Sequence, residues 1–381
     1  MNYCNRTWAE IDLGAAEKNF REIKKRAGKR GIFAVVKANA YGHGALPLAR
    51  LYESLGAKGF AVSNIGEALE LREGGINGEI LVLGYTPYEH TAELIEHDIS
   101  QTVYSYEYAL NLNDFAEKTG RSVKCHIKLD TGMHRLGFEC TDGLSKEAAD
   151  RLRACRTLGN LEYHGVFTHF ATADGNSPED KAFCEKQYND FAKGVNELRE
   201  LGYRFKYIHC DNSAGTLVRD DDITNAVRPG IVLYGYMPST ELDCDADLTP
   251  ILSLRSAVSM IKTILPEDTV SYGRTYTADK PTVIATVPIG YADGYPRSLS
   301  GKGTVLIHGK EAKVVGRVCM DQMMIDISGI DNVQTGDVVT VIGRDGDRVI
   351  TADDIAAADG TISYEILCGL APRVERIYRE K

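Results

Sequence analysis

Eight short apolar runs, separated by amphipathic helical patterns, occupy about the first 240 residues of the chain. Continuous runs of Val, Ile and Ala are typical of strands that are buried on both faces. Eight strand and helix units in this length match the size and rhythm of a (β/α)₈ TIM-type barrel. The runs are Phe33 to Ala40, Gly59 to Asn64, Glu79 to Gly84, Ser100 to Ser105, Val123 to Asp130, Tyr163 to Phe170, Tyr207 to Asn212 and Ala226 to Gly235.

Two of the intervening segments show clear helical patterns, Ile65 to Glu73, which is followed by Gly74-Gly75, and the longer Pro178 to Gly202. A doubly wound open sheet would hold the same alternation. No GxGxxG motif follows the first run, which favours the barrel.

The pattern changes after about residue 240. The later apolar runs are β-branched, closely spaced and joined by Gly-containing turns, and they predict a mostly β domain with one short helix near Thr351 to Ala358. We therefore divide the chain into a barrel, residues 1–240, and a mostly β C-terminal domain, residues 241–381, with a linker near Asp243 to Asp247. The β runs are Pro250 to Val258, Thr282 to Pro288, Thr304 to His308, Ala312 to Gly316 and Asp337 to Ile342.

Composition narrows the class of protein. In the 381 residues no uncharged stretch approaches the roughly 18 apolar residues of a membrane helix, and the start lacks an apolar signal core. The formal net charge of −10 disfavours nucleic acid and anionic membranes as partners. The nine cysteines show no CxxC and no Cys/His cluster, which predicts reduced thiols, no metal site and a cytoplasmic location.

Lys37 stands near the end of the first run, four residues before the segment Tyr41-Gly-His-Gly44. A lysine is costly to bury in such a strand unless it is paired or used. The ordinary alternative is a snorkelling or ion-paired lysine. Two glycines within three residues would let the backbone approach a ligand, which favours a reactive amine.

The C-terminal ends of barrel strands carry the chemistry. Barrels frequently bind phosphate after strands seven and eight, where Ser213 and Gly230 fall. A phosphate there and an amine after strand one suggest pyridoxal phosphate, held as a Schiff base by Lys37. The candidates at strand ends are Lys37, Lys128, Arg135, His169, His209, Asn212, Ser213, Arg228, Gly230 and Ile231.

Seven segments carry a resemblance that runs through nearly the whole chain. They are Trp8 to Leu13, Ala34 to Gly44, Lys128 to Gly137, Thr168 to Asp174, Val270 to Tyr276, Pro288 to Gly294 and Gly316 to Gln322. In these segments the chain resembles the alanine racemase family of fold-type III pyridoxal-phosphate enzymes.

The resemblance implies a role for each candidate at the barrel rim. Lys37 would carry the cofactor, His169 would pack at its ring, and Arg228 would face the pyridine nitrogen. His209 would orient Arg228, with a satisfied core histidine as the equal alternative. A guanidinium is donor-only and always charged, so it favours an unprotonated ring nitrogen, and proton return to Cα becomes the favoured outcome. The residues near the phosphate would be Tyr41, Asn212, Ser213, Gly230 and Ile231.

Racemisation needs one base on each face of Cα, and the resemblance implies Lys37 and Tyr272. Because a free tyrosine titrates near 10, we expect a positive neighbour and assign His169 to that role. Taken alone, Tyr272 would be an ordinary half-buried strand tyrosine.

By the same resemblance, the second domain reaches the active site of the other subunit of a homodimer, so that a monomer would be inactive. Tyr291 would narrow the entrance. The Met320 amide and Arg135 would receive oxygens of the substrate or cofactor, with Asp321 supporting them from behind.

Lys128 matches a position at which family members carry a lysine carbamylated by carbon dioxide. The resulting anion would hold Arg135. The alternative is an unmodified lysine facing a carboxylate such as Asp130.

The implied activity is interconversion of L-alanine and D-alanine for peptidoglycan precursors. Pro372 stands where some members have a tyrosine, so a serine or broad-specificity racemase is the alternative. A noncatalytic pyridoxal-phosphate-binding protein would lack the second domain, and a fold-type III decarboxylase would show a different, cysteine- and aspartate-centred motif.

Overall fold

The computed structural model describes residues 6–380 and separates them into two compact units. The barrel unit holds residues 16–40 and 45–249. The β unit holds the segment up to Ala15, residues 41–44 and the chain from Pro250 onward.

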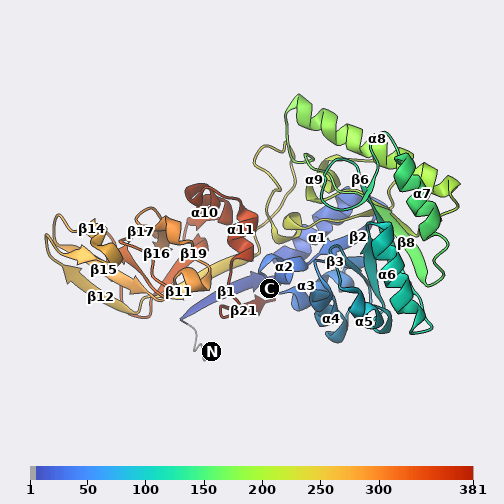
Figure 1. The fold of residues 1–381 in the computed structure, drawn as a ribbon. Helices are drawn as coiled ribbons and strands as arrows, with labels where there is room; N and C mark the ends of the chain where they lie inside the picture. The colour runs from blue at the N-terminus through green and yellow to red at the C-terminus, as the bar shows by residue number, and fades with distance from the viewer. Residues whose placement is uncertain (1–5, 381) are drawn as a thin grey trace. The chain divides into compact units, whose positions relative to one another are not determined.

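The barrel unit is a closed parallel barrel of eight strands, which confirms the predicted fold class. The strands follow one another around the barrel, and pairing of β5 with β6 and of β10 with β2 completes the ring. Figure 1 shows the helices outside these strands. The strands are β2 (Gly31–Val35), β3 (Gly59–Val62), β4 (Glu79–Val82), β5 (Ile99–Val103), β6 (Val123–Asp130), β8 (Leu161–Phe167), β9 (Tyr207–His209) and β10 (Ala226–Val227), and the short β7 (Phe138–Glu139) pairs with β6.

Helix boundaries in the barrel unit follow local capping signals. The predicted helix Ile65 to Glu73 is α4, whose N-cap Asn64 accepts the Glu67 amide, a bond that fixes where the helix starts. The long predicted segment is α8, which begins with Pro178 after the N-cap Ser177. The helices are α1 (Leu13–Ala27), α3 (Ala45–Ser54), α4 (Ile65–Glu73), α5 (Thr91–Glu96), α6 (Tyr106–Glu117), α7 (Lys146–Cys155), α8 (Pro178–Glu200) and α9 (Ser213–Val218).

The first and the last predicted strands end well before their apolar runs do. The first ends at Val35, and the chain then enters the left-handed turn α2 (Lys37–Tyr41). The last ends at Val227, after which Ile231–Tyr234 form a 3₁₀ helix. Apolar composition alone does not distinguish a strand from a buried turn.

The β unit is built on a ten-stranded sheet. Its strand β1 (Thr7–Asp12) pairs with β11 and β21, so the first segment of the chain lies in this unit, unlike our division at residue 240. The other strands of this sheet are β11 (Leu252–Ala257), β12 (Met260–Ile264), β15 (Thr282–Val287), β16 (Thr304–Ile307), β17 (Lys310–Val315), β18 (Met323–Asp326), β19 (Val338–Asp345), β20 (Arg348–Ile350) and β21 (Glu375–Arg379). A separate two-stranded sheet consists of β13 (Thr269–Val270) and β14 (Tyr276–Thr277), and the helices are α10 (Ala352–Asp359) and the unpredicted α11 (Ser363–Cys368).

No helix within residues 6–380 is long and apolar enough to span a membrane. The cysteines in this part of the chain are all free thiols.

Gly42 and Gly44 have a packing role that differs from our expectation. A Cβ on Gly42 would lie 2.1 Å from the Leu367 carbonyl oxygen, and one on Gly44 would lie 1.7 Å from the Tyr378 hydroxyl. Tyr378 and Arg376 also donate hydrogen bonds to the carbonyls of residues 43 and 42. The two glycines therefore leave room for the C-terminal segment of the β unit. We had expected them to leave room for a ligand.

We predict that Gly42→Ala destabilises the protein because the new methyl group overlaps a backbone carbonyl. The matched control is Gly360→Ala in the same unit, since Gly42 and Gly360 have φ of 82° and 83° and a Cβ at residue 360 meets nothing within 4 Å. Urea unfolding should show a loss for Gly42→Ala that exceeds the control by roughly 1–3 kcal/mol. Equal losses would mean that left-handed strain alone explains the glycine.

Candidate active site

Lys37 follows β2 and opens a strained turn. Ala38, Asn39, Ala40 and Tyr41 all have φ between 51° and 53°, a left-handed conformation that costs about 1–2 kcal/mol per residue. Backbone strain of this kind persists only where the surroundings impose it. The turn therefore fixes the direction in which Lys37 leaves the strand.

Two polar side chains hold this turn in the barrel unit. Glu67 of α4 accepts the amides of Ala38 and Ser63, both at 2.7 Å. Asn39 accepts the amide of Ala45 at 2.8 Å and so begins α3. Sequence reasoning missed Glu67, whose position in the first turn of a predicted helix resembles an ordinary helix-dipole carboxylate.

Arg228 is buried beyond β10 without a carboxylate partner. Its Nη2 donates to the carbonyls of Thr168 at 2.7 Å and Cys210 at 3.0 Å, and its Nη1 lies 2.6 Å from Nδ1 of His209. Its Nε donates no hydrogen bond to an acceptor among residues 6–380. The contact favours the orienting role of His209, and the Nε donor is available to an acceptor such as a ring nitrogen.

Ser213 and Gly230 meet where β9 and β10 end. The Ser213 hydroxyl oxygen accepts the Gly230 amide at 2.8 Å, which leaves its own proton free to donate. The Asn212 side chain accepts the Gly215 amide at 3.0 Å, so it caps α9. A hydroxyl donor at this rim suits a phosphate.

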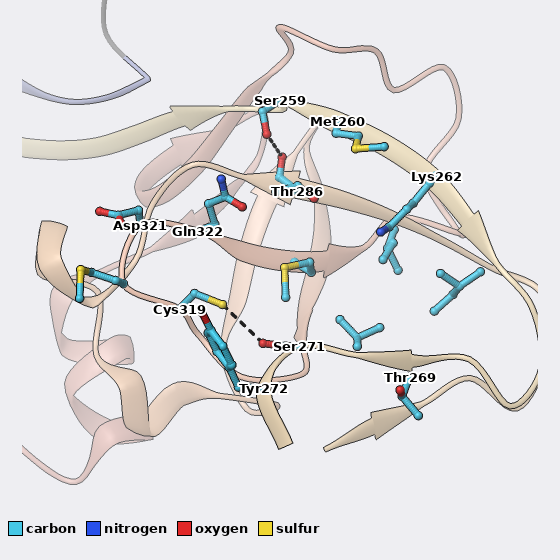
Figure 2. A pocket seen from close by; sticks show the side chains of 15 residues that line it. Ser259, Met260, Lys262, Thr269, Ser271, Tyr272, Thr286, Cys319, Asp321 and Gln322 are labelled. Carbon is cyan, nitrogen blue, oxygen red and sulfur yellow. Dashed lines mark hydrogen bonds between the residues drawn. The ribbon is translucent and has the colours of Figure 1, made fainter. Parts of the chain in front are cut away.

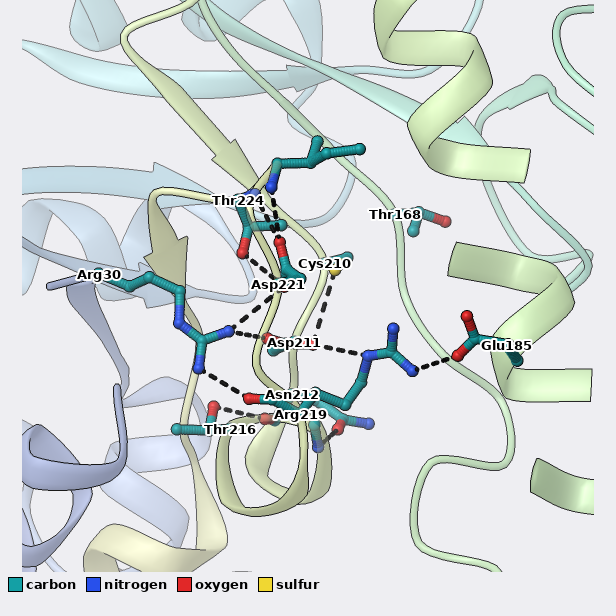
Figure 3. A network of polar contacts seen from close by, with 12 residues as sticks. Arg30, Thr168, Glu185, Cys210, Asp211, Asn212, Thr216, Arg219, Asp221 and Thr224 are labelled. Carbon is teal, nitrogen blue, oxygen red and sulfur yellow. Dashed lines mark hydrogen bonds and ion pairs between the residues drawn. The ribbon is translucent and has the colours of Figure 1, made fainter. Parts of the chain in front are cut away.

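An ion network anchors the loop that carries Asn212 and Ser213 (Figure 3). The fully buried Asp211 pairs with Arg30 at 2.6 Å and faces Arg219 at 3.8 Å, and Asp221 approaches Arg30 at 3.4 Å. The Asp211 carbonyl also accepts the Arg228 amide. Sequence reasoning missed this network because its partners are far apart in the chain.

Lys128 is buried on β6 among positive charges. Burial, followed by Arg228 and Arg135, lowers the pKa of Lys128 to about 7. No carboxylate forms an ion pair with it among residues 6–380, since Asp130 accepts the amides of Gly132 and His134. Asp130 therefore forms no ion pair with Lys128, unlike in the alternative that we considered.

His169 lies close to the same cations. Burial, and after it the charges of Arg228 and Lys128, holds the pKa of His169 well below its usual value. The lowered pKa disfavours a positive charge on His169, and its place beside Tyr272 stays a prediction.

The segment around His169 is held by Gln187, which faces inward from α8. Its side-chain oxygen accepts the Ala171 amide at 2.9 Å, and its NH₂ donates to the His169 carbonyl and to Thr131, both at 3.2 Å. A buried glutamine on the apolar stripe of a predicted helix is a signal that the sequence offered and that we did not use.

Tyr41 belongs to the β unit, where its ring lies 5.9 Å from that of Tyr364. Burial, with the nearby Tyr364, raises the pKa of Tyr41. Its phenol therefore keeps its proton and serves as a donor.

The remaining candidates lie on the surface of the β unit. Tyr272 is 70% exposed, and Met320 and Tyr291 are also exposed. Tyr272 follows Ser271, whose φ is 67°. The Ser271 hydroxyl donates to the Arg317 carbonyl and also contacts the Cys319 sulfur, and these contacts hold the turn. Figure 2 shows this contact beside the Tyr272 ring, at a cavity of about 710 Å³ that Met320 and Asp321 also line.

Two arginines support the Met320 segment from within the β unit. Arg373 donates to Asp321 at 2.7 Å and to the buried Asp293 at 2.8 Å, and Arg6 donates to the Asp321 carbonyl at 2.9 Å. These hydrogen bonds fix the position of Asp321 within the β unit. Pro372, beside Arg373, is exposed.

The closed barrel carries an amine, a buried guanidinium and a hydroxyl donor at its C-terminal rim, and the β unit carries an exposed tyrosine. These features are typical of a two-domain enzyme that holds its cofactor at the mouth of a barrel. The family models for the alanine racemase N-terminal domain and C-terminal domain match residues 11–238 and 251–378. The chain belongs to the alanine racemase family, and this membership makes it an isomerase of the amino-acid racemase class.

Known relatives agree over the full length. An alanine racemase of Clostridium perfringens is 45% identical over 383 residues, covering 100% of this chain and 97% of that protein. The solved alanine racemase of Clostridium difficile 630 has a TM-score of 0.94 at 40% identity and covers 100% of this chain and 97% of that one.

Two further solved relatives are described with bound molecules. The Bacillus anthracis alanine racemase with bound L-Ala-P has a TM-score of 0.93 at 39% identity, covering 100% of this chain and 97% of that one. The Bartonella henselae alanine racemase with covalently bound pyridoxal phosphate has a TM-score of 0.84 at 29% identity, covering 98% of this chain and 100% of that one.

We predict that Gln187→Leu destabilises the protein, because it leaves the Ala171 amide without its acceptor. Urea unfolding should show a loss of roughly 1–3 kcal/mol. Asn189→Leu, at an exposed position of the same helix, is the control and should change the free energy of unfolding by no more than about 0.5 kcal/mol. A neutral Gln187→Leu would show that the glutamine does not hold the His169 segment.

Proposed function

We propose that the protein interconverts L-alanine and D-alanine with pyridoxal 5′-phosphate, in a homodimer whose active sites combine two subunits. The observation that carries the proposal is the buried Arg228, with an Nε donor that no acceptor within residues 6–380 occupies, on the barrel rim that also carries Lys37.

The residues of the rim fit the cofactor. Lys37 would hold it covalently, Arg228 Nε would donate to its ring nitrogen, and the Ser213 hydroxyl with backbone near Gly230 and Ile231 would take its phosphate. We retain Tyr41 as a further phosphate donor because burial keeps its phenol protonated. Pyridoxal phosphate supplies the electron withdrawal that makes the Cα proton of an amino acid acidic.

Arg228 limits how far that electron withdrawal goes. A guanidinium has no proton acceptor, and it stays charged in this site, so a ring nitrogen facing it remains unprotonated. The proton is then favoured to return to Cα, which is the outcome that racemisation needs.

Two bases on opposite faces of Cα complete the reaction. The Lys37 amine serves one face, and Tyr272 of the partner subunit serves the other. In each direction one group removes the proton while the other delivers one. The exposure of Tyr272 on a strained and well-held turn supports a role in binding across subunits, since such a conformation is retained at a cost.

Arg135 is exposed and makes no ion pair within the described residues, so it is available to a substrate carboxylate. The Met320 amide of the partner subunit would add a donor, and the partner's Tyr291 would narrow the entrance. We infer small amino acids as substrates, with alanine first and serine as the alternative because Pro372 offers no hydroxyl. The D-alanine would supply peptidoglycan precursors in the cytoplasm.

We predict that Tyr272→Phe removes one base only. Loaded enzyme should lose roughly 10²–10⁴-fold in alanine racemisation, while one enantiomer still exchanges its Cα proton in deuterium oxide. Tyr276→Phe is the control and should keep both activities. Serine is assayed in parallel, and faster turnover of serine than of alanine would replace the substrate assignment.

A mixture of Lys37→Ala and Tyr272→Phe proteins tests the shared site. If sites are composite, a mixed dimer holds one site with both bases, and activity rises above that of either variant after subunits exchange. If each site lay within one chain, every site in the mixture would lack a base. An inactive mixture that demonstrably contains mixed dimers would contradict the proposal.

We also propose that Lys128 is carbamylated. Its neutral amine attacks carbon dioxide at carbon, an N–C bond forms, one C=O π pair moves to oxygen, and the amine releases a proton. The product is an anion among cations, and it would pair with Arg135. The lowered pKa of Lys128 supports this, because only the neutral amine is nucleophilic.

The carbamate should depend on pH with a definite sign. Lys128 is mostly protonated one unit below its pKa of about 7 and mostly neutral one unit above it, so carbamylation should increase with pH across this range. Isotope-labelled carbon dioxide gives a carbamate carbon signal that measures it. Lys128→Arg is the control and should lack the signal; its persistence would assign the carbamate to another amine.

A further inference from the structure

A column of buried polar side chains runs through the barrel away from Arg228. His209 Nε2 lies 2.9 Å from His126 Nδ1, and His126 Nε2 lies 3.6 Å from a carboxylate oxygen of Glu79. Both histidines are fully buried, and the Glu79 side chain is 8% exposed. Glu79 begins β4, so the column connects the catalytic rim with the opposite end of the barrel.

The fold makes specific room for this column. The His209 ring is nearly parallel to the rings of Phe167 and Phe33, with centroid distances of 5.0 Å and 5.7 Å. A Cβ on Gly165 of β8 would lie 2.3 Å from His126 Nδ1. The two imidazoles are therefore held in place by packing as well as by hydrogen bonds.

The hydrogen bonds of the column have only one consistent direction. Arginine has no acceptor, so Nδ1 of His209 accepts from Arg228. A neutral His209 then carries its proton on Nε2 and donates to His126 Nδ1. His126 in turn carries its proton on Nε2, which points at Glu79. Protonating either histidine would set two donors against each other.

The charges agree with this direction. Burial, and then the Arg228 charge, holds the pKa of His209 well below its usual value, and burial also lowers the pKa of His126. Burial opposes ionisation of Glu79, but contacts from His126 and His164 outweigh it and hold the pKa of Glu79 below its usual range. Ser100 donates to the same carboxylate at 2.7 Å, and Lys206 faces it at 3.6 Å.

The end of the column needs a carboxylate. His126 Nε2 is buried and has no hydrogen-bond partner among residues 6–380, and the Glu79 oxygen is the acceptor that faces it. Arg228 likewise has no direct counter-charge, because the nearby Asp211 is committed to Arg30 and Arg219. Glu79 is therefore the anion that faces the last ring of the hydrogen-bonded series from Arg228, at 3.6 Å from His126 Nε2.

We propose that Glu79 and His126 are positioning residues, which receive the hydrogen bonds that start at Arg228, hold the His209 ring in place and thereby aim the Nε of Arg228 at the cofactor ring. The tautomers are properties of the protein alone, whereas the consequence for the ring nitrogen rests on the proposed function. The direction of the Arg228 side chain thus depends on Glu79, which lies at the end of the barrel opposite the catalytic rim.

The direct test is long-range proton–nitrogen NMR of protein carrying isotope-labelled histidine, without and with pyridoxal phosphate. His126→Asn and His209→Asn assign the two rings. We expect two neutral imidazoles with the proton on Nε2 that do not titrate around neutral pH. The variants serve only to assign the signals, and the tautomers are read in the unmutated protein. A protonated ring, or a proton on Nδ1 of either histidine, overturns the proposal.

Two substitutions at Glu79 separate acceptor from charge. Glu79→Gln keeps an acceptor for His126, whereas Glu79→Leu removes it and should abolish the uniform Nε2–H state of His126. Glu162→Gln, at a carboxylate that contacts His164 and not His126, is the control and should change neither ring. An unaltered His126 tautomer in a folded Glu79→Leu protein overturns the proposal.

The loaded enzyme gives the second readout. Glu79→Leu should increase transamination relative to racemisation by roughly tenfold. This factor corresponds to a change of about one unit in the pKa of the ring nitrogen. The KM for alanine should stay unchanged. If the tautomers are as expected but the protein racemises no amino acid, the proposed function is rejected and the proposal about the tautomers is retained. An unchanged ratio in an active Glu79→Leu enzyme would overturn the positioning role.

Discussion

The burial of Arg228 without a carboxylate partner is the constraint on which the candidate site depends. A guanidinium taken out of water needs acceptors for its donors, and here two backbone carbonyls and one imidazole supply them. These partners come from the ends of β8 and β9, while Arg228 follows β10, so its burial ties three strand ends together. Burial, and after it the charge of Arg228, lowers the pKa values of Lys128 and His169. The buried cation therefore favours the neutral forms of both neighbours.

Both proposed bases stand at strained turns. Lys37 precedes four left-handed residues, and Tyr272 lies between Ser271 and Gly273, which also have positive φ. In each case side-chain hydrogen bonds compensate the strain: Glu67 and Asn39 hold the first turn, and Ser271 binds Arg317 and Cys319 at the second. Positive φ for residues other than glycine is uncommon and is concentrated at functional sites. The two units thus use the same device to direct a reactive side chain out of a strand end.

His169 shows why residue type alone is a weak guide to a catalytic role. Its place at a strand end and its usual pKa suggested a positive charge beside the tyrosine base. In the folded protein it is half-buried, and burial followed by the charges of Arg228, Lys128, Arg135 and Lys37 holds its pKa well below its usual value.

Apolar periodicity and spacing were sufficient to determine the barrel and the second β domain, because a buried parallel strand must be apolar and its C-terminal end must leave the core. Helix caps at Asn64 and Ser177 are equally local, since they need only a side-chain oxygen near the first free amides. The sequence did not reveal that the first strand joins the β unit, that Gly42 and Gly44 receive the C-terminal segment, or that Asp211, Gln187 and Glu79 support the site. These features depend on pairs such as Arg30 and Asp211, 181 residues apart, which only the closed barrel brings together. Charge states were likewise decided by the tertiary structure, because burial and neighbouring charges set a pKa, and neither exists along an extended chain.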